Sequence, residues 1–435
     1  MSILVSCFEA DATPPLGYPL CNGNVPPAIR VIDSLSARGI VLEPEGQSPI
    51  VLCVVDWVTV NNESHDLWRK ILAEAAGTSV DRVSVHCTHP HDAPGADRVA
   101  QRLLDEVGLE KAICDPAFED RVLEGVAHAV INSRKNSRSV THLSLGKAKV
   151  EKFASSRRLI GPDGKVAQVR YSSCKNEKVR AMEEGLVDPY VRLIGFWEKQ
   201  RPVAVLSYYA SHPQSFYWTG AVSNDTAGLV RGVRDAAVSE ALHVYFIGAG
   251  GNVAAGKYND GTPTNRLRLA ERLAGGMECA WDNSVKVPLV AADVEWKTQE
   301  IAIPPSAALT DSTRLIEIMK DPSSSFYQRS MSASKLAFAS RCQAGRMYAL
   351  ACLRLGPARI LHTPGELFVE YQIAAQAVRP GEFVAVAAYG DCGPGYIGTQ
   401  AAYAQGGYEC DPCHARVAPE IEAVFKDAIT QLLST

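Results

Sequence analysis

Short runs of apolar, β-favouring residues recur along the chain, and segments with helical spacing lie between several of them. Residues 83–87 alternate apolar and polar side chains at a period of two, which is typical of a half-buried strand. The alternation of strands and helices predicts an α/β or mixed α+β fold, with layered mixed β-sheets flanked by helices. The predicted strands are residues 50–55, 83–87, 203–209, 243–247, 358–362 and 383–388, and the predicted helices are residues 67–76, 118–131, 226–240, 265–279 and 333–355.

The chain is expected to fold as one unit over residues 1–435, because it has neither an internal repeat nor a low-complexity linker. The most loop-like region is residues 155–178. Within it, Gly161-Pro162-Asp163-Gly164 predicts a hairpin turn on the surface or over a site. A break near residues 281–287 precedes a second β-rich portion.

The amino-acid composition indicates which kinds of molecule the protein is expected to bind. Hydrophobic residues make up 46% of the 435 residues and charged residues 21%, which is typical of a soluble globular protein. Lys and Arg number 44 against 48 Asp and Glu, and there is no dense basic run. We therefore expect the protein to bind neither nucleic acid nor a membrane stably. A small-molecule substrate is the expected partner. The oligomeric state is left open.

The N-terminal residues and the cysteines indicate a cytoplasmic protein. Residues 1–11 lack a basic segment and carry an apolar run shorter than that of a signal peptide. No apolar stretch reaches the length of a transmembrane helix. The twelve cysteines are scattered, many in apolar surroundings, as expected for reduced, buried thiols rather than for a disulfide framework.

The segment Thr88-His89-Pro90-His91-Asp92-Ala93-Pro94-Gly95 is the strongest chemical signal. It follows a predicted strand, and Pro90 favours extended geometry at His89. Residues two apart in an extended chain point the same way, so His89 and His91 are expected to project together. The spacing suits one metal ligand beside an acid/base, or two ligands to one ion. A rigid loop with incidental histidines is the alternative.

Other polar residues also follow predicted strands, where side chains converge at the edge of a layered sheet. His212, followed by Pro213, repeats the arrangement of His89, although a histidine at a strand end is often only a hydrogen-bonded residue. Glu366 lies three residues after Thr363, which is the spacing of a helix capping box. Capping a helix is therefore the alternative to a role of Glu366 as a metal ligand. Tyr396 lies in a glycine-rich loop and would otherwise merely pack.

Two further motifs give weaker signals. Gly248-Ala249-Gly250-Gly251-Asn252 does not match a nucleotide-binding fingerprint, and its glycines are expected to let backbone N–H groups approach a substrate, with Asn252 and Lys257 as polar contacts. Cys410-Asp411-Pro412-Cys413-His414 fits the pattern of haem attachment. Haem attachment normally requires export, and the sequence shows no export signal. We therefore expect these two thiols to have no special role.

Taken in order, these segments resemble the amidase domain of the neutral (non-lysosomal) ceramidases. The resemblance rests on the motifs around His89, His212, Gly250-Gly251-Asn252-Val253, Thr363-Pro364-Gly365-Glu366 and Tyr396 through Glu409, together with residues 11–17 and 187–191. It spans nearly the whole chain. The resemblance implies a catalytic zinc held by His89, His212, Glu366 and Tyr396. It also implies His91 as the acid/base, with Arg157 and Tyr408 as groups that contact the substrate carbonyl.

The sequence departs from the family pattern at several points. The usual His-Thr-His-Ser-Gly-Pro-Gly is here His-Pro-His-Asp-Ala-Pro-Gly, so Asp92 stands next to His91. The chain ends soon after its last predicted helix, and we expect a short cytosolic member without the family's C-terminal β-domain. A lipid substrate is therefore not expected.

Together these features predict a zinc-dependent amidohydrolase that cleaves a C–N bond of a small polar substrate. Zinc lowers the pKa of a coordinated water, and His91 would transfer the proton. Asp92, Asn252 and Lys257 are expected to bind the substrate with Arg157. Two alternatives stay open: a metal-dependent hydrolase or lyase acting on an ester, lactone or glycosidic bond, and a non-catalytic, metal-stabilised binding protein.

Overall fold

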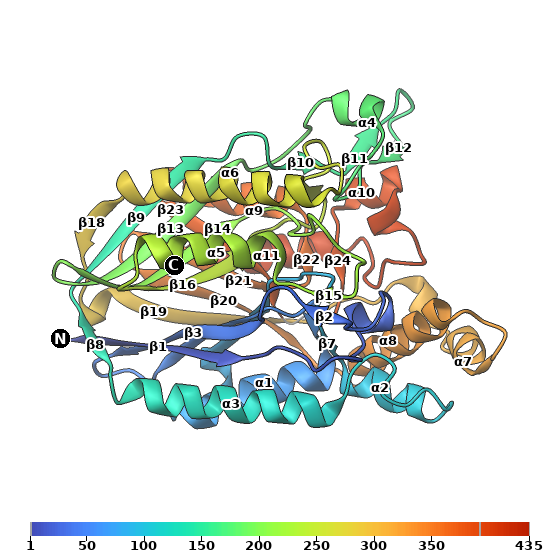
Figure 1. The fold of residues 1–435 in the computed structure, drawn as a ribbon, viewed down its shortest axis with the longest axis horizontal. Helices are drawn as coiled ribbons and strands as arrows, with labels where there is room; N and C mark the ends of the chain where they lie inside the picture. Colours follow the sequence, from blue (N-terminus) through green and yellow to red (C-terminus); the bar gives the residue numbers. More distant parts are fainter. Residues whose placement is uncertain (1, 391–392, 435) are drawn as a thin grey trace.

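Two β-sheets packed face to face form the centre of the molecule (Figure 1). The computed structural model describes residues 2–390 and 393–434. Within these residues, nine strands form the larger sheet in the order β19-β20-β21-β23-β6-β4-β3-β1-β8. Their bounds are β1 Ile3–Asp11, β3 Ser36–Pro44, β4 Ile50–Val55, β6 Val83–Cys87, β8 Arg138–Val140, β19 Val294–Ile301, β20 Tyr348–Leu355, β21 Ala358–Pro364 and β23 Phe383–Gly390.

The smaller sheet has the order β16-β14-β13-β9-β18. Its strands are β9 His142–Lys149, β13 Tyr190–Glu198, β14 Arg201–Tyr209, β16 Leu242–Ile247 and β18 Val285–Pro288. β14 and β16 are parallel, and the other pairs are antiparallel. An apolar core fills the space between the two sheets, with side chains such as Ile40, Ile194, Phe246 and Ile360 fully buried in it.

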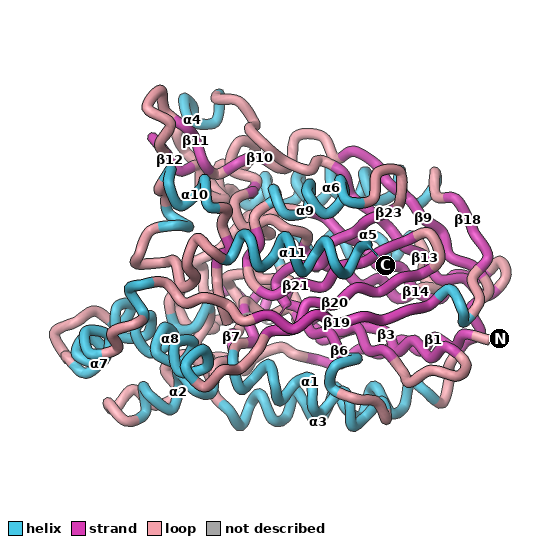
Figure 2. Tube along the Cα trace, turned by 180° about the vertical axis from the view of Figure 1, so that it is seen from behind, coloured by secondary structure: helices cyan, strands magenta, loops and turns pink. Residues whose placement is uncertain are grey.

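Helices cover the outer face of each sheet, which gives four layers. α1 and α3 run along one side of the strands and α6 along the other in Figure 1, and α11 lies over β19 and β20 in the opposite view (Figure 2). The covering helices are α1 Asn62–Ala76, α3 Pro116–Arg134, α5 Asp225–Ala237, α6 Pro263–Asp282, α9 Val369–Val378 and α11 Ile421–Ser434. None of the helices described is long and apolar enough to cross a bilayer.

Short elements gather at the end of the molecule opposite the N-terminus (Figure 1, Figure 2). The helices there are α2 Arg98–Asp105, α4 Glu177–Ala181, α7 Thr313–Lys320, α8 Phe326–Gln343 and α10 Gln400–Gln405. The short strands are β2 Arg30–Val31, β5 Thr59–Val60, β7 Gly95–Ala96, β10 Ser155–Ser156, β11 Arg158–Ile160, β12 Val166–Val169, β15 Ala221–Val222, β17 Val253–Ala254, β22 Glu366–Leu367 and β24 Tyr396–Ile397.

The layered α/β fold predicted from the sequence is confirmed. Each of the six predicted strands exists, with ends displaced by at most two residues. The predicted turn at residues 161–164 joins β11 to β12, and Gly164 has the left-handed φ of +73° that such a turn requires. Four of the five predicted helices are also present.

The helix predicted over residues 333–355 is wrong. α8 begins earlier, ends at Gln343, and is followed by a turn in which Gly345 has a φ of +65°. Residues 348–355 instead form β20, because they pair with both β19 and β21 in the larger sheet. The backbone N–H and C=O groups of this segment form hydrogen bonds with β19, which precedes it by about 50 residues, and with β21, which follows it. This pairing outweighs the local helical pattern.

Replacing Phe246 by Ala tests the packing between the sheets. Phe246 is fully buried, and its ring stacks on Tyr208 with centroids 5.1 Å apart. We expect the free energy of unfolding in urea to fall by about 3–5 kcal/mol, because the change removes apolar contacts and leaves a cavity. Leu267→Ala, on an exposed face of α6, is the control and should change it by less than about 0.5 kcal/mol. Equal effects of the two changes would contradict the two-sheet core.

Candidate metal centre and its cavities

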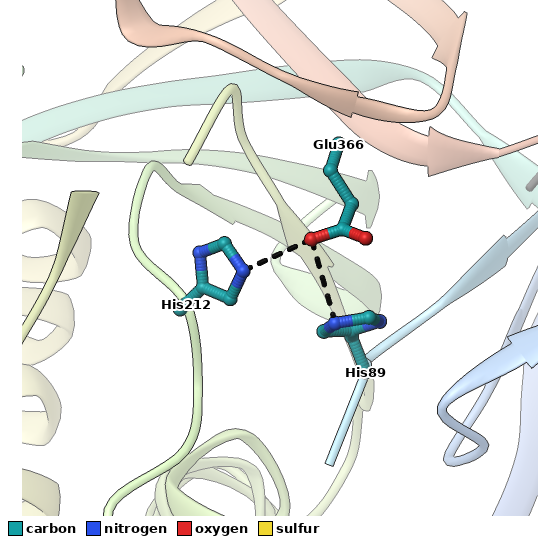
Figure 3. Close-up of side chains that lie close together, drawn as sticks. All are labelled: His89, His212 and Glu366. Carbon is teal, nitrogen blue, oxygen red and sulfur yellow. Dashed lines mark hydrogen bonds and ion pairs between the residues drawn. The ribbon is translucent and has the colours of Figure 1, made fainter. Parts of the chain in front are cut away.

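Three side chains that are far apart in the sequence converge beyond the ends of β6, β14 and β21. His89, His212 and Glu366 each offer a ligand atom, and these atoms lie within 4.8 Å of one another (Figure 3). Glu366 Oε2 lies 3.1 Å from His212 Nε2 and 3.7 Å from His89 Nε2. The two halves of the larger sheet meet nearby, where His86 pairs with Gly390 close to the carboxyl ends of β6 and β23. Such a junction is where ligands bind in layered sheets.

Hydrogen bonds to the backbone fix the orientation of both imidazoles. Nδ1 of His89 donates to the carbonyl of Val58, and Nδ1 of His212 donates to that of Gly250, each over 2.6 Å. In a neutral imidazole the other nitrogen, Nε2, then carries a lone pair. Two nitrogen lone pairs and a carboxylate oxygen therefore face one another, and they repel unless a cation lies between them. This donor set fits a divalent metal ion.

The electrostatics of the triad agree with this assignment. Burial lowers the pKa of His89 to about 4, so its ring is neutral at pH 7. Burial alone would raise the pKa of Glu366, but the neighbouring His89 and His212 hold it at about 2. The carboxylate is thus charged and both groups are in the forms that bind metal.

His89 adopts a backbone conformation that the sequence analysis did not expect. Its φ is +59°, in the left-handed region, rather than the extended geometry expected from the following Pro90. The carbonyl of Trp57 accepts a hydrogen bond from the N–H of His89, and the chain turns there instead of continuing the strand. His89 and His91 still lie side by side, with ring centroids 5.4 Å apart. A strained non-glycine residue of this kind is typical of a functional site.

Two adjoining cavities open at the triad. The inner cavity, of ≈ 200 Å³, is lined by His89, His91 and Glu366 among others. The aromatic cavity, of ≈ 620 Å³, is lined by His212 and Arg157 and by six aromatic residues besides the shared Tyr396: Tyr171, Phe216, Tyr217, Trp218, Tyr327 and Tyr408. His91, Tyr396 and Tyr408 line both. Volumes of this size are typical of sites for small molecules.

His91 is suited to proton transfer. Burial, followed by the nearby His89 and His212, holds the pKa of His91 well below its usual value, so the ring is a neutral base at pH 7. Its Nδ1 is buried and has no hydrogen-bond partner among the described residues. An imidazole with an unpaired nitrogen beside the triad can accept and return a proton.

Arg157 lies between the triad and the tyrosines Tyr396 and Tyr408. Its Nη1 donates to the hydroxyl of Tyr396 over 3.1 Å and lies 3.4 Å from His212 Nε2. Burial alone would lower the pKa of Arg157, but Tyr396 and Glu409 outweigh it and the pKa is raised. Burial raises the pKa of Tyr408, so this phenol stays protonated and can donate a hydrogen bond.

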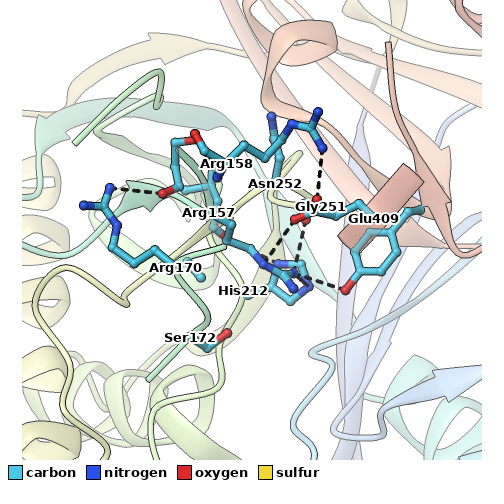
Figure 4. A network of polar contacts seen from close by, with 12 residues as sticks. Arg157, Arg158, Arg170, Ser172, His212, Gly251, Asn252 and Glu409 are labelled. Carbon is cyan, nitrogen blue, oxygen red and sulfur yellow. Dashed lines mark hydrogen bonds and ion pairs between the residues drawn. The ribbon is translucent and has the colours of Figure 1, made fainter. Parts of the chain in front are cut away.

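A buried carboxylate holds this arginine in place, and the sequence analysis missed its role. Glu409 is fully buried between two guanidinium groups (Figure 4). Its Oε1 lies 3.4 Å from Arg157 Nε, and its Oε2 lies 3.1 Å from Arg158 Nη1. Its position next to Tyr408 is the only sequence signal that could have indicated it.

Three residues predicted to contact the substrate have protein hydrogen-bond partners, and none of them lines either cavity. The carboxylate of Asp92 accepts hydrogen bonds from the backbone and hydroxyl of Thr219 and so holds that loop. Asn252 accepts from the N–H of Val369, the first residue of α9, and donates to Glu370. Lys257 donates to backbone carbonyls at the end of α4, including that of Arg180.

The glycines before Asn252 also have a different purpose from the one expected. A Cβ atom on Gly251 would lie 2.2 Å from the carbonyl oxygen of Glu366, and one on Gly250 would lie 2.9 Å from the backbone of Ser211. The glycines therefore allow the segments that carry Glu366 and His212 to approach each other, rather than a substrate to approach the backbone.

The Cys-x-x-Cys-His segment contributes one residue to the cavities. Cys410 is buried and Cys413 is exposed, and neither is in a disulfide. His414 lines both cavities, and its ring centroid lies 4.0 Å from that of Tyr408. The motif thus supplies a wall of the site through its histidine, which the sequence analysis did not predict.

Comparisons with known proteins identify the fold. No family model matches the sequence, and no curated protein matches it. Among solved structures, a ceramidase complexed with C2 aligns over 100% of this chain and 75% of its own, with a TM-score of 0.73 and 14% identity. A neutral ceramidase from Pseudomonas aeruginosa aligns over 100% and 74%, with a TM-score of 0.72 and 14% identity. The chain therefore has a neutral ceramidase-like fold.

Proposed function

We propose that this protein is a zinc-dependent hydrolase that cleaves an amide bond of a small polar substrate in the cytoplasm. The observation that carries the proposal is the neutral His91 beside three converging candidate ligand atoms, at the wall of the inner cavity. The ceramidase-like fold supports the reaction class, since ceramidases cleave an amide. The described cysteines are all free, which supports the cytoplasmic assignment, because disulfides are rare in reducing compartments.

The residues divide the work of hydrolysis among them. His89, His212 and Glu366, with Tyr396 as a fourth candidate ligand, would hold the ion. A bound Zn²⁺ supplies Lewis acidity, which polarises the carbonyl and makes water a better nucleophile. His91 accepts the proton of the attacking water and returns it to the leaving nitrogen, so that a C–O bond forms as the C–N bond breaks. Arg157 and Tyr408 donate hydrogen bonds to the oxygen on which charge develops.

The metal ligands can be tested without any substrate. We expect close to one zinc ion per chain in protein purified without added metal, and loss of most of it in the double variant His89→Ala with His212→Ala, because two of the three ligands are removed. Plasma mass spectrometry gives the metal content. His128→Ala, on the exposed face of α3, is the matched control and should keep the metal. Zinc that survives the double change would contradict the site.

His91→Ala separates proton transfer from metal binding. We expect zinc content equal to that of the wild type and a kcat lower by roughly 10²–10⁴, because the general base is lost. Turnover of a panel of soluble N-acyl amides, measured by amine release, gives the rate. A variant with near-normal kcat would remove His91 from the proposed role, and loss of zinc would make it a ligand instead.

Tyr408→Phe removes a single hydroxyl group from the cavity wall. We expect kcat to fall by roughly 10²–10³ with little change in metal content, because one donor to the developing oxyanion is lost. Tyr190→Phe, at an exposed position on β13 that lines neither cavity, deletes the same atom and is the control. If both variants turned over equally fast, Tyr408 would have no part in the reaction.

A further inference from the structure

Arg416 is a cation on the wall of the inner cavity that the proposed reaction does not use. The same cavity is lined by His89, His91 and Glu366, so Arg416 faces the reacting groups. Its Nη1 donates to the carbonyl of Gly393 over 2.7 Å, and its Nη2 donates to the hydroxyl of Ser334 over 2.9 Å. Both acceptors are neutral. These two bonds leave three of the five N–H groups of the guanidinium for other partners.

The charge of Arg416 has no ion-pair partner among the residues that the structure describes. Of the carboxylates there, Asp97 and Glu366 act on it most strongly, yet neither comes within 4.0 Å. Asp97 is already used, since it accepts from Asn62 and caps α2 through Ala100. Glu366 belongs to the proposed metal-binding set. Elsewhere in this site, by contrast, the buried guanidinium groups of Arg157 and Arg158 share Glu409.

A second cation, Lys335, lies near enough to Arg416 to add to the positive field there. Lys335 of α8 donates to the carbonyl of Pro412, two residues before His414 and four before Arg416. Burial, followed by the nearby Arg416, lowers the pKa of Lys335. Neither cation is within ion-pair distance of a described carboxylate. Desolvating unpaired cations is costly, and the cost is recovered when an anion binds.

We infer that Arg416 is the specificity-determining residue of this site and that it binds a carboxylate on the substrate. The substrate class is then an N-acylated amino acid or a similar compact amide with an anionic group. The inner cavity, of ≈ 200 Å³, has His89, Glu366 and Arg416 on its walls, so a compact molecule can contact all three. A guanidinium is suited to this task, because its paired N–H groups match the two oxygens of a carboxylate.

The aromatic residues around this cation suit the rest of such a substrate. Trp218, Tyr327 and Tyr408 line both cavities, together with His414. Trp218 is 65% exposed, with a left-handed φ of +67°, and so presents its ring at the rim. In an amide that carries one apolar side chain and one carboxylate, the side chain would pack against these aromatic rings and the carboxylate would bind Arg416. This inference rests on the proposed amide hydrolysis for its reaction but on Arg416 for its selectivity.

Two amides that differ by one carboxylate test the inference. N-acetyl-L-phenylalanine and N-acetylphenethylamine have the same acetamide bond and the same aromatic group, and only the first is anionic. Affinity is read from quenching of tryptophan fluorescence in a stopped-flow instrument before turnover, and kcat/KM from amine release. For the wild-type protein we expect at least about tenfold tighter binding and higher kcat/KM for the anionic amide, as for a charge-assisted hydrogen bond.

Variants of Arg416 then separate recognition from structure. We expect Arg416→Gln to weaken binding of the anionic amide about tenfold and to leave the neutral amide unchanged, while Arg416→Lys keeps most of the preference. Equal weakening of both amides, or no preference in the wild type, would overturn the inference. Preferential binding without hydrolysis of either amide would contradict the proposed function and uphold the role of Arg416. Hydrolysis with preference for the neutral amide would uphold the proposed function and contradict the role of Arg416.

Discussion

The hydrogen bonds from two imidazoles to two backbone carbonyls are the constraint on which the site depends. His89 and His212 use Nδ1 to bind the carbonyls of Val58 and Gly250, which turns both Nε2 atoms toward Glu366. Those carbonyls lie on the loops that follow the strands of two different sheets. The packing of the sheets against each other therefore sets the spacing of the ligand atoms, and Gly251 lets the segments approach closely enough for this.

Around this centre, charge is distributed unevenly. Glu409 balances the guanidinium groups of Arg157 and Arg158, and this ion-paired cluster keeps Arg157 against the hydroxyl of Tyr396. His91 is neutral because it is buried near two other histidines. Arg416, on the wall of the inner cavity, has no paired carboxylate among the described residues. The two adjoining cavities thus contain a neutral base, a fixed donor and a cation without a described ion-pair partner.

The sequence predicted most of the fold from runs of β-favouring residues, continuous in β4 and alternating with polar residues in β6, and both strands were identified to the residue. It failed at residues 348–355, where pairing with β19 and β21 makes a strand of a segment with a helical pattern. In the site, the candidate metal ligands were predicted from their place after strands together with the resemblance of the motifs. Their convergence in the structure agrees with that prediction.

What the sequence could not give is the direction in which each polar side chain points. Asp92 follows His91 directly, yet it binds Thr219, 127 residues away, and not the cavity. Arg416 lines the inner cavity although no local spacing marks it, and the Cys-x-x-Cys-His spacing that marks His414 gives no sign that it lines a cavity. Such contacts depend on the tertiary arrangement of loops, and residue type alone does not encode them.

The most direct test of this account is X-ray absorption spectroscopy at the zinc edge on the purified 435-residue protein. The account predicts a first shell of nitrogen and oxygen atoms only, at about 2.0–2.2 Å, from two imidazoles and a carboxylate with further oxygen. Multiple scattering from two imidazole rings should be visible. A shell with sulfur at about 2.3 Å would assign the metal to cysteines and contradict the proposed centre.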